Sequence, residues 1–362
     1  MFIRKLFLTA IYLLLSSSAL AASAAPRYTL TFLPTGFEPG PYHPLNNTGR
    51  IAGTYQGRVA IFDRGGLHPV KSPPAVGNGI NDRSDITGRV TGSNTAFAII
   101  GGRFVDIHAT LSSFYYTSDG EVINNRGSVA GVADPFADEA VRGFLYRQGR
   151  SELVPTLGGE FSFITGLNNL DGVVGWASNA TGSVNDPNYH AILYRDGRLH
   201  DLGTLPGGLR SQAFDINDRW QIVGASETGT LKIGNPEHPF LFQNGKMTDL
   251  GTLGASSGRA LAINNGGLVV GDTGRTDQLR VAFLYVSGKM LDLNDLTQVP
   301  AGWRLDTAQD INDIGQIVAT ACYGIGGACV PVRLDPVCPC NAGEAPPTPA
   351  PMPRHRAFHT KQ

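Results

Sequence analysis

A Leu-Asn or Ile-Asn pair recurs at seven regularly spaced positions in this chain of 362 residues, and a small residue follows seven positions after each of these Asn. The interval between copies is 35 to 49 residues. Self-similarity at such an interval is typical of a repeat architecture. The repeated residues are Asn46, Asn81, Asn124, Asn168, Asn217, Asn264 and Asn312, followed by Gly53, Gly88, Gly131, Gly175, Gly224, Gly271 and Ala319. A repeat scaffold constrains the fold strongly and the function weakly, because its loops can carry almost any activity.

Each repeat is long enough for four short strands, and residues 211–253 form the clearest copy. Its first run alternates small and large residues with period two, as a strand does. Asn244-Gly245 then indicates a two-residue hairpin turn, because both central positions of that turn require positive φ. The strands expected in this copy are 211–217, 221–225, 239–242 and 246–253. Four antiparallel strands per repeat predict an all-β, seven-bladed β-propeller.

The last copy contains only three expected strands, in residues 307–312, 316–322 and 329–334. Residues 27–34 alternate in the same way as the fourth strand of another copy, 199–206, and end in the same Leu-Pro pair. We therefore expect the N-terminal strand to complete blade seven. Such closure removes the unpaired sheet edge that an open ring would expose.

The N-terminus has the features of a secretory signal peptide over residues 1–25. Arg4 and Lys5 precede an apolar run, 6–15, that is too short to cross a bilayer, and small residues place cleavage near Ala21 or Ala24. This predicts a secreted or periplasmic protein with no membrane insertion after cleavage. The propeller is then expected over 26–336, and the Pro-rich residues 337–362 form a disordered tail.

Composition excludes several partner classes. Charged residues make up 16% of the chain, below the ~25% of average proteins, and the formal net charge is -1. Nothing in this balance would attract nucleic acid or an anionic membrane. We expect a monomer without a cofactor.

The four cysteines fit an exported protein. Cys322 and Cys329 flank a hairpin tip in the last copy, and a disulfide there would be worth about 2.5 kcal/mol in the chain-entropy model. We expect this pairing. Cys338 and Cys340 follow the last strand, so a link from the tail to the hairpin is the alternative, and a zinc site using all four thiols is a further one.

The repeat resembles the HAF family of bacterial extracellular repeats. The family unit runs roughly Ala-x-x-Ile-Asn-x-x-Gly-x-Val-Val-Gly, then His-Ala-Phe-Leu-aromatic, then Met-x-Asp-Leu-Gly-Thr-Leu-Gly-Gly. The matching segments are 260–271, 281–285, 246–254, 190–194 and 199–208. The resemblance covers most of 40–320 and is weak in blades one and two. It implies secretion and a propeller, and no assigned activity.

The repeated Asn and Gly have structural interpretations. Each Asn ends a strand, where its side chain can hydrogen-bond the backbone of the following turn. The Gly at plus seven allows neighbouring backbone to approach closely near the propeller axis.

Two further repeat positions carry ionisable residues. Asp215 and Asp310 share a position on the innermost strand and could face the central channel, where carboxylates can bind a hard cation such as calcium. His190 and His238 share another position, and we expect blade-to-blade hydrogen bonds from them rather than catalysis. Our prediction is that the protein has no metal site.

Candidate binding residues concentrate on one face. The loops after the second and fourth strands emerge on the same side and are the long ones, and long loops on a rigid scaffold commonly carry binding residues. Trp220 is the exception, because it takes a turn position on the other face that is otherwise mostly Gly. It either contacts a ligand or packs under a neighbouring turn. The candidates are Phe136, Trp176, Asp186, Asn188, Tyr189, Trp220 and Glu237.

The leading functional hypothesis is a secreted, noncatalytic interaction module that binds an extracellular protein or glycan. One alternative is a polysaccharide lyase or glycosidase, which would need a carboxylate pair or a Tyr-Arg-His group. The sequence specifies no such catalytic set. The other alternative is a structural matrix component.

Overall fold

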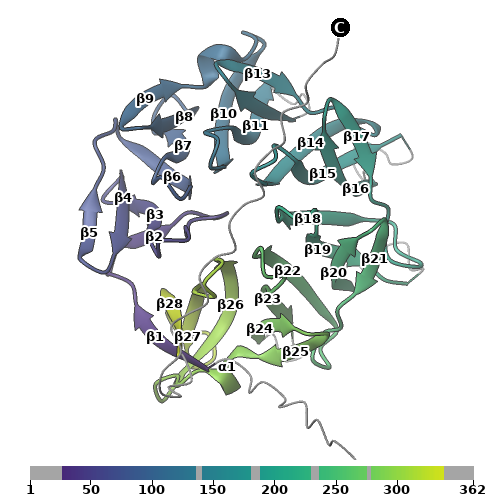
Figure 1. Ribbon diagram of the computed structural model, residues 1–362. Coiled ribbons are helices and arrows are strands. Elements are labelled where there is room, and N and C mark those ends of the chain that lie inside the picture. Colours follow the sequence, from purple (N-terminus) through teal and green to yellow (C-terminus); the bar gives the residue numbers. More distant parts are fainter. Residues whose placement is uncertain (1–26, 136–140, 181–187, 230–235, 275–278, 338–362) are drawn as a thin grey trace, which may run out of the picture.

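The computed structural model describes residues 27–135, 141–180, 188–229, 236–274 and 279–337. These residues form seven four-stranded antiparallel sheets arranged in a ring (Figure 1). The sequence-based prediction of a seven-bladed propeller is confirmed. Besides strands, this part of the chain contains a 3-10 helix, His108–Thr110, and one turn of α-helix, α1, Leu293–Leu296. None of its helices is long and apolar enough to span a membrane.

Each blade runs from an innermost to an outermost strand. Blades one to three are β2 (Phe37–Pro39), β3 (Ile51–Tyr55), β4 (Arg58–Asp63), β5 (Gly66–Pro69); β6 (Ala75–Ile80), β7 (Ile86–Val90), β8 (Thr95–Ile100), β9 (Arg103–Asp106); and β10 (Tyr115–Ile123), β11 (Val129–Pro135), β12 (Arg142–Arg147), β13 (Arg150–Leu153).

The next three blades repeat this order with longer inner strands than blade one. Blades four to six are β14 (Gly158–Leu167), β15 (Val173–Asn179), β16 (Tyr189–Arg195), β17 (Arg198–Asp201); β18 (Ser211–Ile216), β19 (Ile222–Glu227), β20 (Glu237–Gln243), β21 (Lys246–Asp249); and β22 (Ser257–Ile263), β23 (Val269–Gly274), β24 (Arg280–Val286), β25 (Lys289–Asp292). The predicted hairpin turn in blade five is confirmed, since Asn244 and Gly245 have φ of 52° and 76°.

Blade seven is built from both ends of the described chain. Its strands are β26 (Trp303–Ile311), β27 (Ile317–Tyr323), β28 (Cys329–Val337) and, outermost, β1 (Arg27–Phe32). β1 pairs antiparallel with β28 from Arg27 opposite Val337 to Phe32 opposite Val332. Tyr28 is 2% exposed and packs in one apolar cluster with Leu293 and Leu305. The N-terminal strand therefore closes the ring, as the sequence predicted.

The Gly at plus seven permits close contact between the two inner strands of a blade. A Cβ added to Gly88 would lie 2.0 Å from the carbonyl oxygen of Val76, and one added to Gly175 would lie 1.9 Å from that of Phe163. Real Cβ atoms do not come so close to backbone, so a larger residue would push the inner strand away. The structure supports the interpretation made from the sequence.

The repeated Asn side chains form a closed ring of hydrogen bonds around the axis. Each Asn Oδ1 accepts hydrogen bonds from the turn that follows it, as expected; that of Asn217, for example, accepts from the backbone N–H of Arg219 and Gln221, both at 3.0 Å. Each Asn Nδ2 donates to the backbone carbonyl of the Asn in the next blade. The seven donors are Asn46, Asn81, Asn124, Asn168, Asn217, Asn264 and Asn312, the last donating to Asn46, at 2.8 to 3.2 Å.

A second closed ring involves the residue after each Asn. Its backbone N–H donates to the side-chain oxygen of the equivalent residue in the next blade, at 2.7 to 2.9 Å. The members are Asn47, Asp82, Asn125, Asn169, Asp218, Asn265 and Asp313. Sequence analysis did not identify this ring, although the presence of Asn or Asp directly after every repeated Asn was the available signal.

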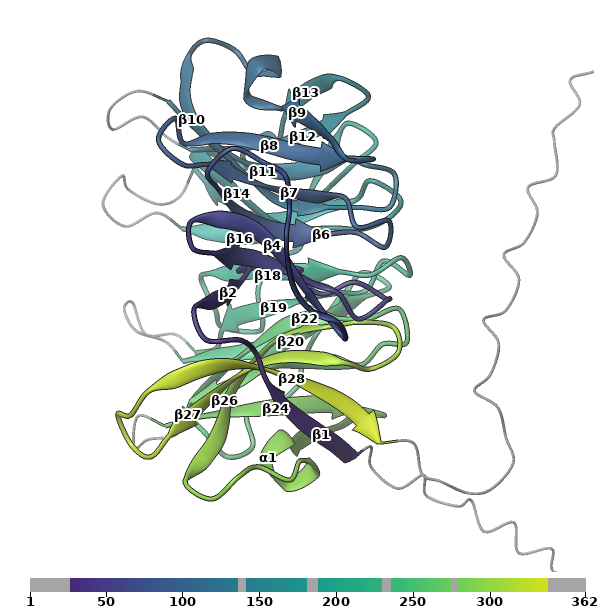
Figure 2. The same ribbon diagram turned by 90° about the vertical axis from the view of Figure 1, so that its left-hand side faces the viewer.

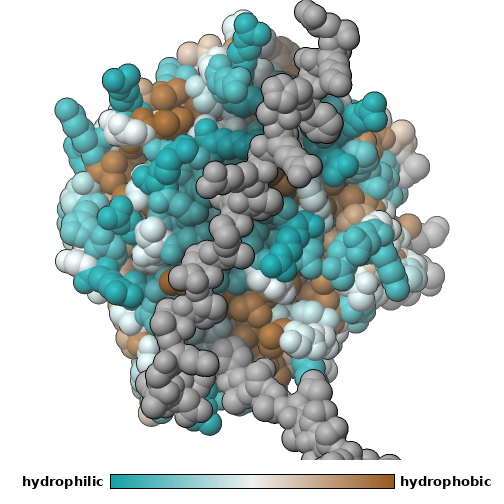
Figure 3. Space-filling model, viewed as in Figure 1, coloured by the Kyte–Doolittle hydropathy of each residue, from teal (hydrophilic) through white to brown (hydrophobic). Residues whose placement is uncertain are grey.

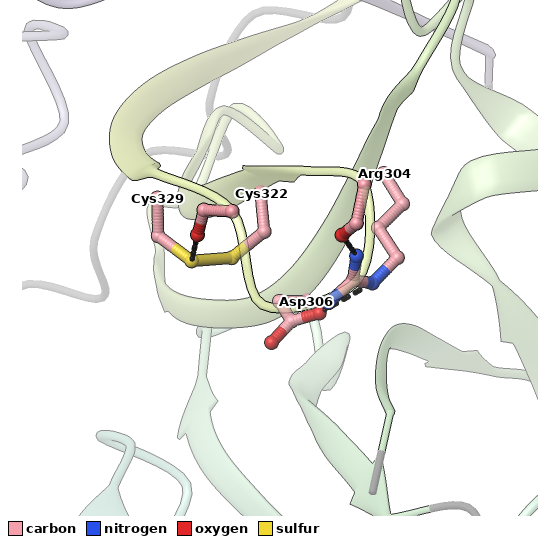
Figure 4. The surroundings of a disulfide bond; sticks show 6 residues. Arg304, Asp306, Cys322 and Cys329 are labelled. Atoms are coloured by element: carbon pink, nitrogen blue, oxygen red, sulfur yellow. Dashed lines mark hydrogen bonds and ion pairs between the residues drawn. A yellow bond between two sulfur atoms is a disulfide. The ribbon is translucent and has the colours of Figure 1, made fainter. Parts of the chain in front are cut away.

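A disulfide fixes the hairpin between β27 and β28, as expected. Cys322 and Cys329 are directly opposed in the ladder and bonded at 2.04 Å (Figure 4). Arg304 on β26 forms an ion pair with Asp306 at 2.9 Å and also donates to the carbonyl of Gly324 at the hairpin tip. Cys338 and Cys340 lie outside the described residues.

We predict that removing β1 destabilises the whole ring. A mature chain lacking residues 26–34 exposes the edge of β28 and loses the buried Tyr28, a loss comparable with a large-to-small core substitution, about 3 kcal/mol or more. Chemical denaturation and light scattering would report lower stability and self-association. The control is a chain lacking 338–362, which should unfold as the mature protein does; equal stability of all three proteins would contradict closure by β1.

Candidate functional site

The two faces of the ring differ in loop length (Figure 2). The loops after the second and fourth strands of the blades lie on one face, the long-loop face, and the tight turns after each Asn lie on the other, the short-turn face. Figure 3 shows the short-turn face, where hydrophilic residues surround the centre. Near the long-loop face, Phe114, Tyr116 and Tyr323 are 54%, 65% and 54% exposed. Three strongly exposed aromatic rings thus lie on the same face as the long loops.

The central channel is crossed by a short excursion of blade one. The N–H of Gly40 donates to the carbonyl of Ala52 at 3.1 Å, and the N–H of Ala52 donates to the carbonyl of Pro44 at 2.8 Å. Residues 41–43 therefore leave the ladder between β2 and β3 and extend toward the axis (Figure 1). Sequence analysis missed this excursion. Its signal was the run Pro39-Gly-Pro-Tyr-His-Pro44, because Pro cannot donate to a strand ladder.

His43 lies at the end of this excursion between two buried carboxylates. Its Nε2 is 3.2 Å from Oδ1 of Asp215 in blade five, and its Nδ1 is 3.6 Å from Oδ1 of Asp310 in blade seven. Burial alone would lower the pKa of His43, but the charges and hydrogen bonds of both aspartates outweigh it and raise that pKa well above 6.5. His43 is consequently an imidazolium at neutral pH and ties blade one to the opposite side of the ring.

Asp215 and Asp310 also satisfy backbone donors of the inner strands. Oδ2 of Asp215 accepts from the N–H of Ile263 at 2.7 Å, and Oδ2 of Asp310 accepts from the N–H of Leu45 at 2.9 Å. Both carboxylates line a cavity of about 130 Å³ in the channel, and this is the channel-facing position that the sequence suggested. Among the residues described, no group of three or more His, Cys, Asp or Glu is arranged to hold a metal ion.

Trp176 belongs to an aromatic cluster on the inner strands of blades four and five. It stacks on Phe163 with ring centroids 5.2 Å apart and meets Phe214 edge-on at 6.3 Å. Phe161 continues the cluster to Tyr189, at 5.7 Å from Phe163 and 6.4 Å from Tyr189. The cluster joins two predicted binding residues, Trp176 and Tyr189, and packs them into the scaffold.

An open pocket of about 650 Å³ lies where blades four, five and six meet on the long-loop face. It gathers two residues predicted from the sequence, Tyr189 and Glu237, which lie on different blades. Its lining residues are Tyr189, Arg210, Glu227, Pro236, Glu237, Ser256 and Ser257. Sequence analysis missed Arg210, Glu227 and the two serines, because they come together only when neighbouring blades pack.

The pocket holds two carboxyl groups directly opposite each other. Glu227 ends β19 and Glu237 begins β20, and the two are partners in the ladder. Like charges in this arrangement are destabilising. Burial raises the pKa of Glu237, and the Glu227 charge adds to this, while Arg259 and Arg210 oppose it. Burial and the two glutamates also raise the pKa of Tyr189 to about 12, so its phenol stays a hydrogen-bond donor.

A second pair of carboxyl groups lies on the inner strand of blade three. Nδ2 of Asn78 donates to Oδ1 of Asp119 at 2.7 Å and to Oε2 of Glu121 at 3.4 Å, and Arg89 is 3.1 Å from Asp119. Burial raises the pKa of Asp119 to about 6. Burial and the Asp119 charge raise the pKa of Glu121 to about 8, so at neutral pH Glu121 is largely protonated. The sequence offered no repeat signal for this pair.

The other predicted residues that the structure describes do not line the pocket. Phe136 and Asp186 lie outside the described residues. The carbonyl of Asn188 accepts from the N–H of Asn179 at 2.9 Å. Trp220 has φ of 62°, lies under Arg195 at 4.7 Å, and packs on the turn at Gly172, where an added Cβ would be 2.5 Å from its ring.

The expectation for His190 and His238 was wrong in one respect. Nδ1 of His190 lies 2.9 Å from Asp201, and Nδ1 of His238 lies 2.7 Å from Asp249. Each pair joins the third and fourth strands of the same blade rather than two blades. The strand register places the Asp on the neighbouring strand within reach of each His.

Comparison with known proteins supports the fold and leaves the family open. No family model matches the chain, and no curated protein matches it, so the HAF resemblance stays a prediction. A gluconolactonase from Xanthomonas campestris is 13% identical with a TM-score of 0.44, covering 86% of this chain and 95% of that one. The β-propeller domain of the Trilobed protease from Pyrococcus furiosus, described as having an open velcro topology, is 10% identical with a TM-score of 0.52, covering 85% and 96%.

We predict that the stabilising effect of His43 depends on pH. Because its folded-state pKa is raised, this stabilisation is complete below the unfolded pKa of about 6.5 and is lost as pH rises through the folded pKa. The difference in unfolding free energy between the natural protein and His43→Gln should therefore shrink from pH 6 toward pH 9. Asp119 and Glu121 are common to both proteins, so their titration cancels. A difference independent of pH would contradict the proposed charge state.

Proposed function

We propose that the mature chain is an extracytoplasmic, noncatalytic binding protein whose partner, an extracellular glycan or protein, docks on the long-loop face. The observation that carries this proposal is the pocket at blades four to six, which brings Tyr189, Arg210, Glu237 and Ser257 together from separate blades. Ligand sites are commonly concave and combine aromatic surface with a few placed polar groups. Export is supported by the N-terminal leader and agrees with the disulfide in blade seven.

The scaffold suits binding because its geometry is held independently of the loops. Both hydrogen-bonded rings lie at the short-turn ends of the inner strands, away from the pocket. Residues of the pocket are therefore positioned before a ligand arrives, which lowers the entropic cost of binding. Loop sequence on this face can vary without loss of the ring.

We predict that binding requires Tyr189 and tolerates change at Trp220. Mature protein would be screened against a glycan array and against extracellular proteins, and the affinity of any ligand measured for two variants. Tyr189→Ala should weaken binding about tenfold or more, as is common for a central aromatic residue. Trp220→Gly lies on the short-turn face at a position with φ of 62°, so it should leave affinity unchanged. The reverse pattern would place the site on the other face.

One observation favours a second candidate function, glycoside hydrolysis. The opposed pair Glu227 and Glu237 supplies two carboxyl groups, and burial raises the pKa of Glu237, which is the direction that a general acid requires. Glu227 would then act as the base or nucleophile. The flanking Arg259 and Arg210, which lower the pKa of Glu237, make this the weaker candidate.

Catalysis would be detected as release of reducing ends from polysaccharides. If the pair is catalytic, Glu237→Gln and Glu227→Gln should each reduce the rate at least 100-fold while ligand binding is retained. We expect instead that the natural protein releases no more reducing ends than a protein carrying both substitutions. If the natural protein is active and both substitutions abolish that activity, the binding hypothesis is wrong and the protein is a glycoside hydrolase.

A further inference from the structure

Charged side chains of alternating sign extend from the pocket across blades five and six. Arg210 lies over the ring of Tyr189 of blade four at 5.6 Å, and its charge acts on Glu237. The charge of Arg259 in blade six also acts on Glu237. Arg259 in turn donates to Oδ2 of Asp272 at 2.7 Å. Basic and acidic groups therefore follow one another through blades five and six, beginning beside Tyr189 of blade four.

This row, which we call the blade 4–6 row, carries no net charge. Arg280 lies 3.5 Å from Asp272 and is its last basic member. Among the residues described, three arginines face three carboxyl groups: Arg210, Arg259 and Arg280, and Glu227, Glu237 and Asp272. A charged ligand would gain little long-range attraction here, because each attractive group stands beside a repulsive one.

The row does offer many hydrogen-bond groups to an uncharged ligand. The guanidinium groups of the three arginines donate, the carboxyl group of Glu237 accepts, and hydroxyl groups such as those of Ser256 and Ser257 do both. Glu227 and Asp272 are 7% and 3% exposed and add little to this surface. Sugar hydroxyls donate and accept in the same way, so consecutive hydroxyls can match consecutive members of the row. The phenol of Tyr189, which stays protonated, adds a donor at one end.

We propose that the pocket and the blade 4–6 row bind an uncharged oligosaccharide laid across blades four, five and six. This inference rests on the proposed binding function and specifies its ligand. An extended ligand is required because one sugar ring could reach only part of a surface that runs from Tyr189 in blade four to Arg280 in blade six. A polyuronate would place its carboxylates against Glu227 and Glu237 in the pocket, and a polyamine would meet the three arginines.

The test is calorimetric titration of mature protein with neutral hexasaccharides of glucose and mannose in different linkages. The parallel probes are the corresponding disaccharides and an oligogalacturonate of equal length. We expect at least one neutral hexasaccharide to bind, with an affinity that changes less than about twofold between 50 and 500 mM NaCl, since few ionic contacts are made or lost. Its disaccharide should bind at least tenfold more weakly.

Two variants locate that binding. Arg210→Gln and Glu237→Gln keep side-chain size, and each should weaken the hexasaccharide about tenfold or more, because a charge-assisted hydrogen bond is lost. Glu152→Gln is the matched control: Glu152 also pairs with an arginine, Arg147 at 2.9 Å, but lies in blade three away from the row. The control should bind as the natural protein does. Thermal unfolding of each variant checks that the ring is intact.

The inference is overturned if the oligogalacturonate binds more tightly than every neutral probe, or if affinity falls steeply with salt. It is also overturned if no glycan of a broad array binds, or if Arg210→Gln and Glu237→Gln bind normally. If a protein partner binds and Tyr189→Ala abolishes that binding, the oligosaccharide inference is overturned and the proposed function stands. If Tyr189→Ala changes the affinity of no ligand, both are overturned.

Discussion

The hydrogen bond from each repeated Asn to the next blade is the interaction on which the rest of the structure depends. A blade alone is a four-stranded sheet with apolar residues on both sides, and it is stable only against two neighbours. The Asn hydrogen bonds fix the angular position of each neighbouring blade. The last of them joins Asn312 of blade seven to Asn46 of blade one and so closes the ring. A buried side-chain amide without its partner would cost about 1–3 kcal/mol, so each blade depends on the next.

Closure of the ring creates an electrostatic problem at its axis. Inner strands bring backbone donors and carboxylates into a narrow channel, where Asp215 and Asp310 are 4% and 2% exposed. Two buried carboxylates are unfavourable unless a positive charge accompanies them. The excursion of blade one provides that charge as His43, which explains why blade one departs from the repeat. The short β2 strand, Phe37–Pro39, is the structural consequence.

The hydrogen-bonded rings do not constrain the sequence of the long-loop face, and the candidate site lies on this face. Tyr189, Arg210, Glu237 and Arg259 come from three blades. Tyr189 and Glu237 hold one repeat position, directly before His190 and His238, and the two arginines hold others. They are close in space because blades four to six are consecutive around the ring. Their charges balance locally, so the site can bury carboxyl groups beside arginines. The specificity for a ligand thus depends on side chains that are not required for the fold.

Much of the architecture followed from the sequence alone. The spacing of the repeated Asn and Gly, the period-two strands, the closing role of 27–34 and the Cys322–Cys329 disulfide were all readable, because each depends on residues close in sequence or on a repeated pattern. The sequence also singled out Tyr189 and Glu237 as loop residues, without indicating that they meet. The partnership of Glu227 and Arg210 with them, the second hydrogen-bonded ring and the His43 bridge appeared only in the tertiary structure. The second ring joins residues 35 to 266 positions apart, and His43 reaches carboxylates in blades five and seven. Such contacts are set by how the blades pack and not by local pattern.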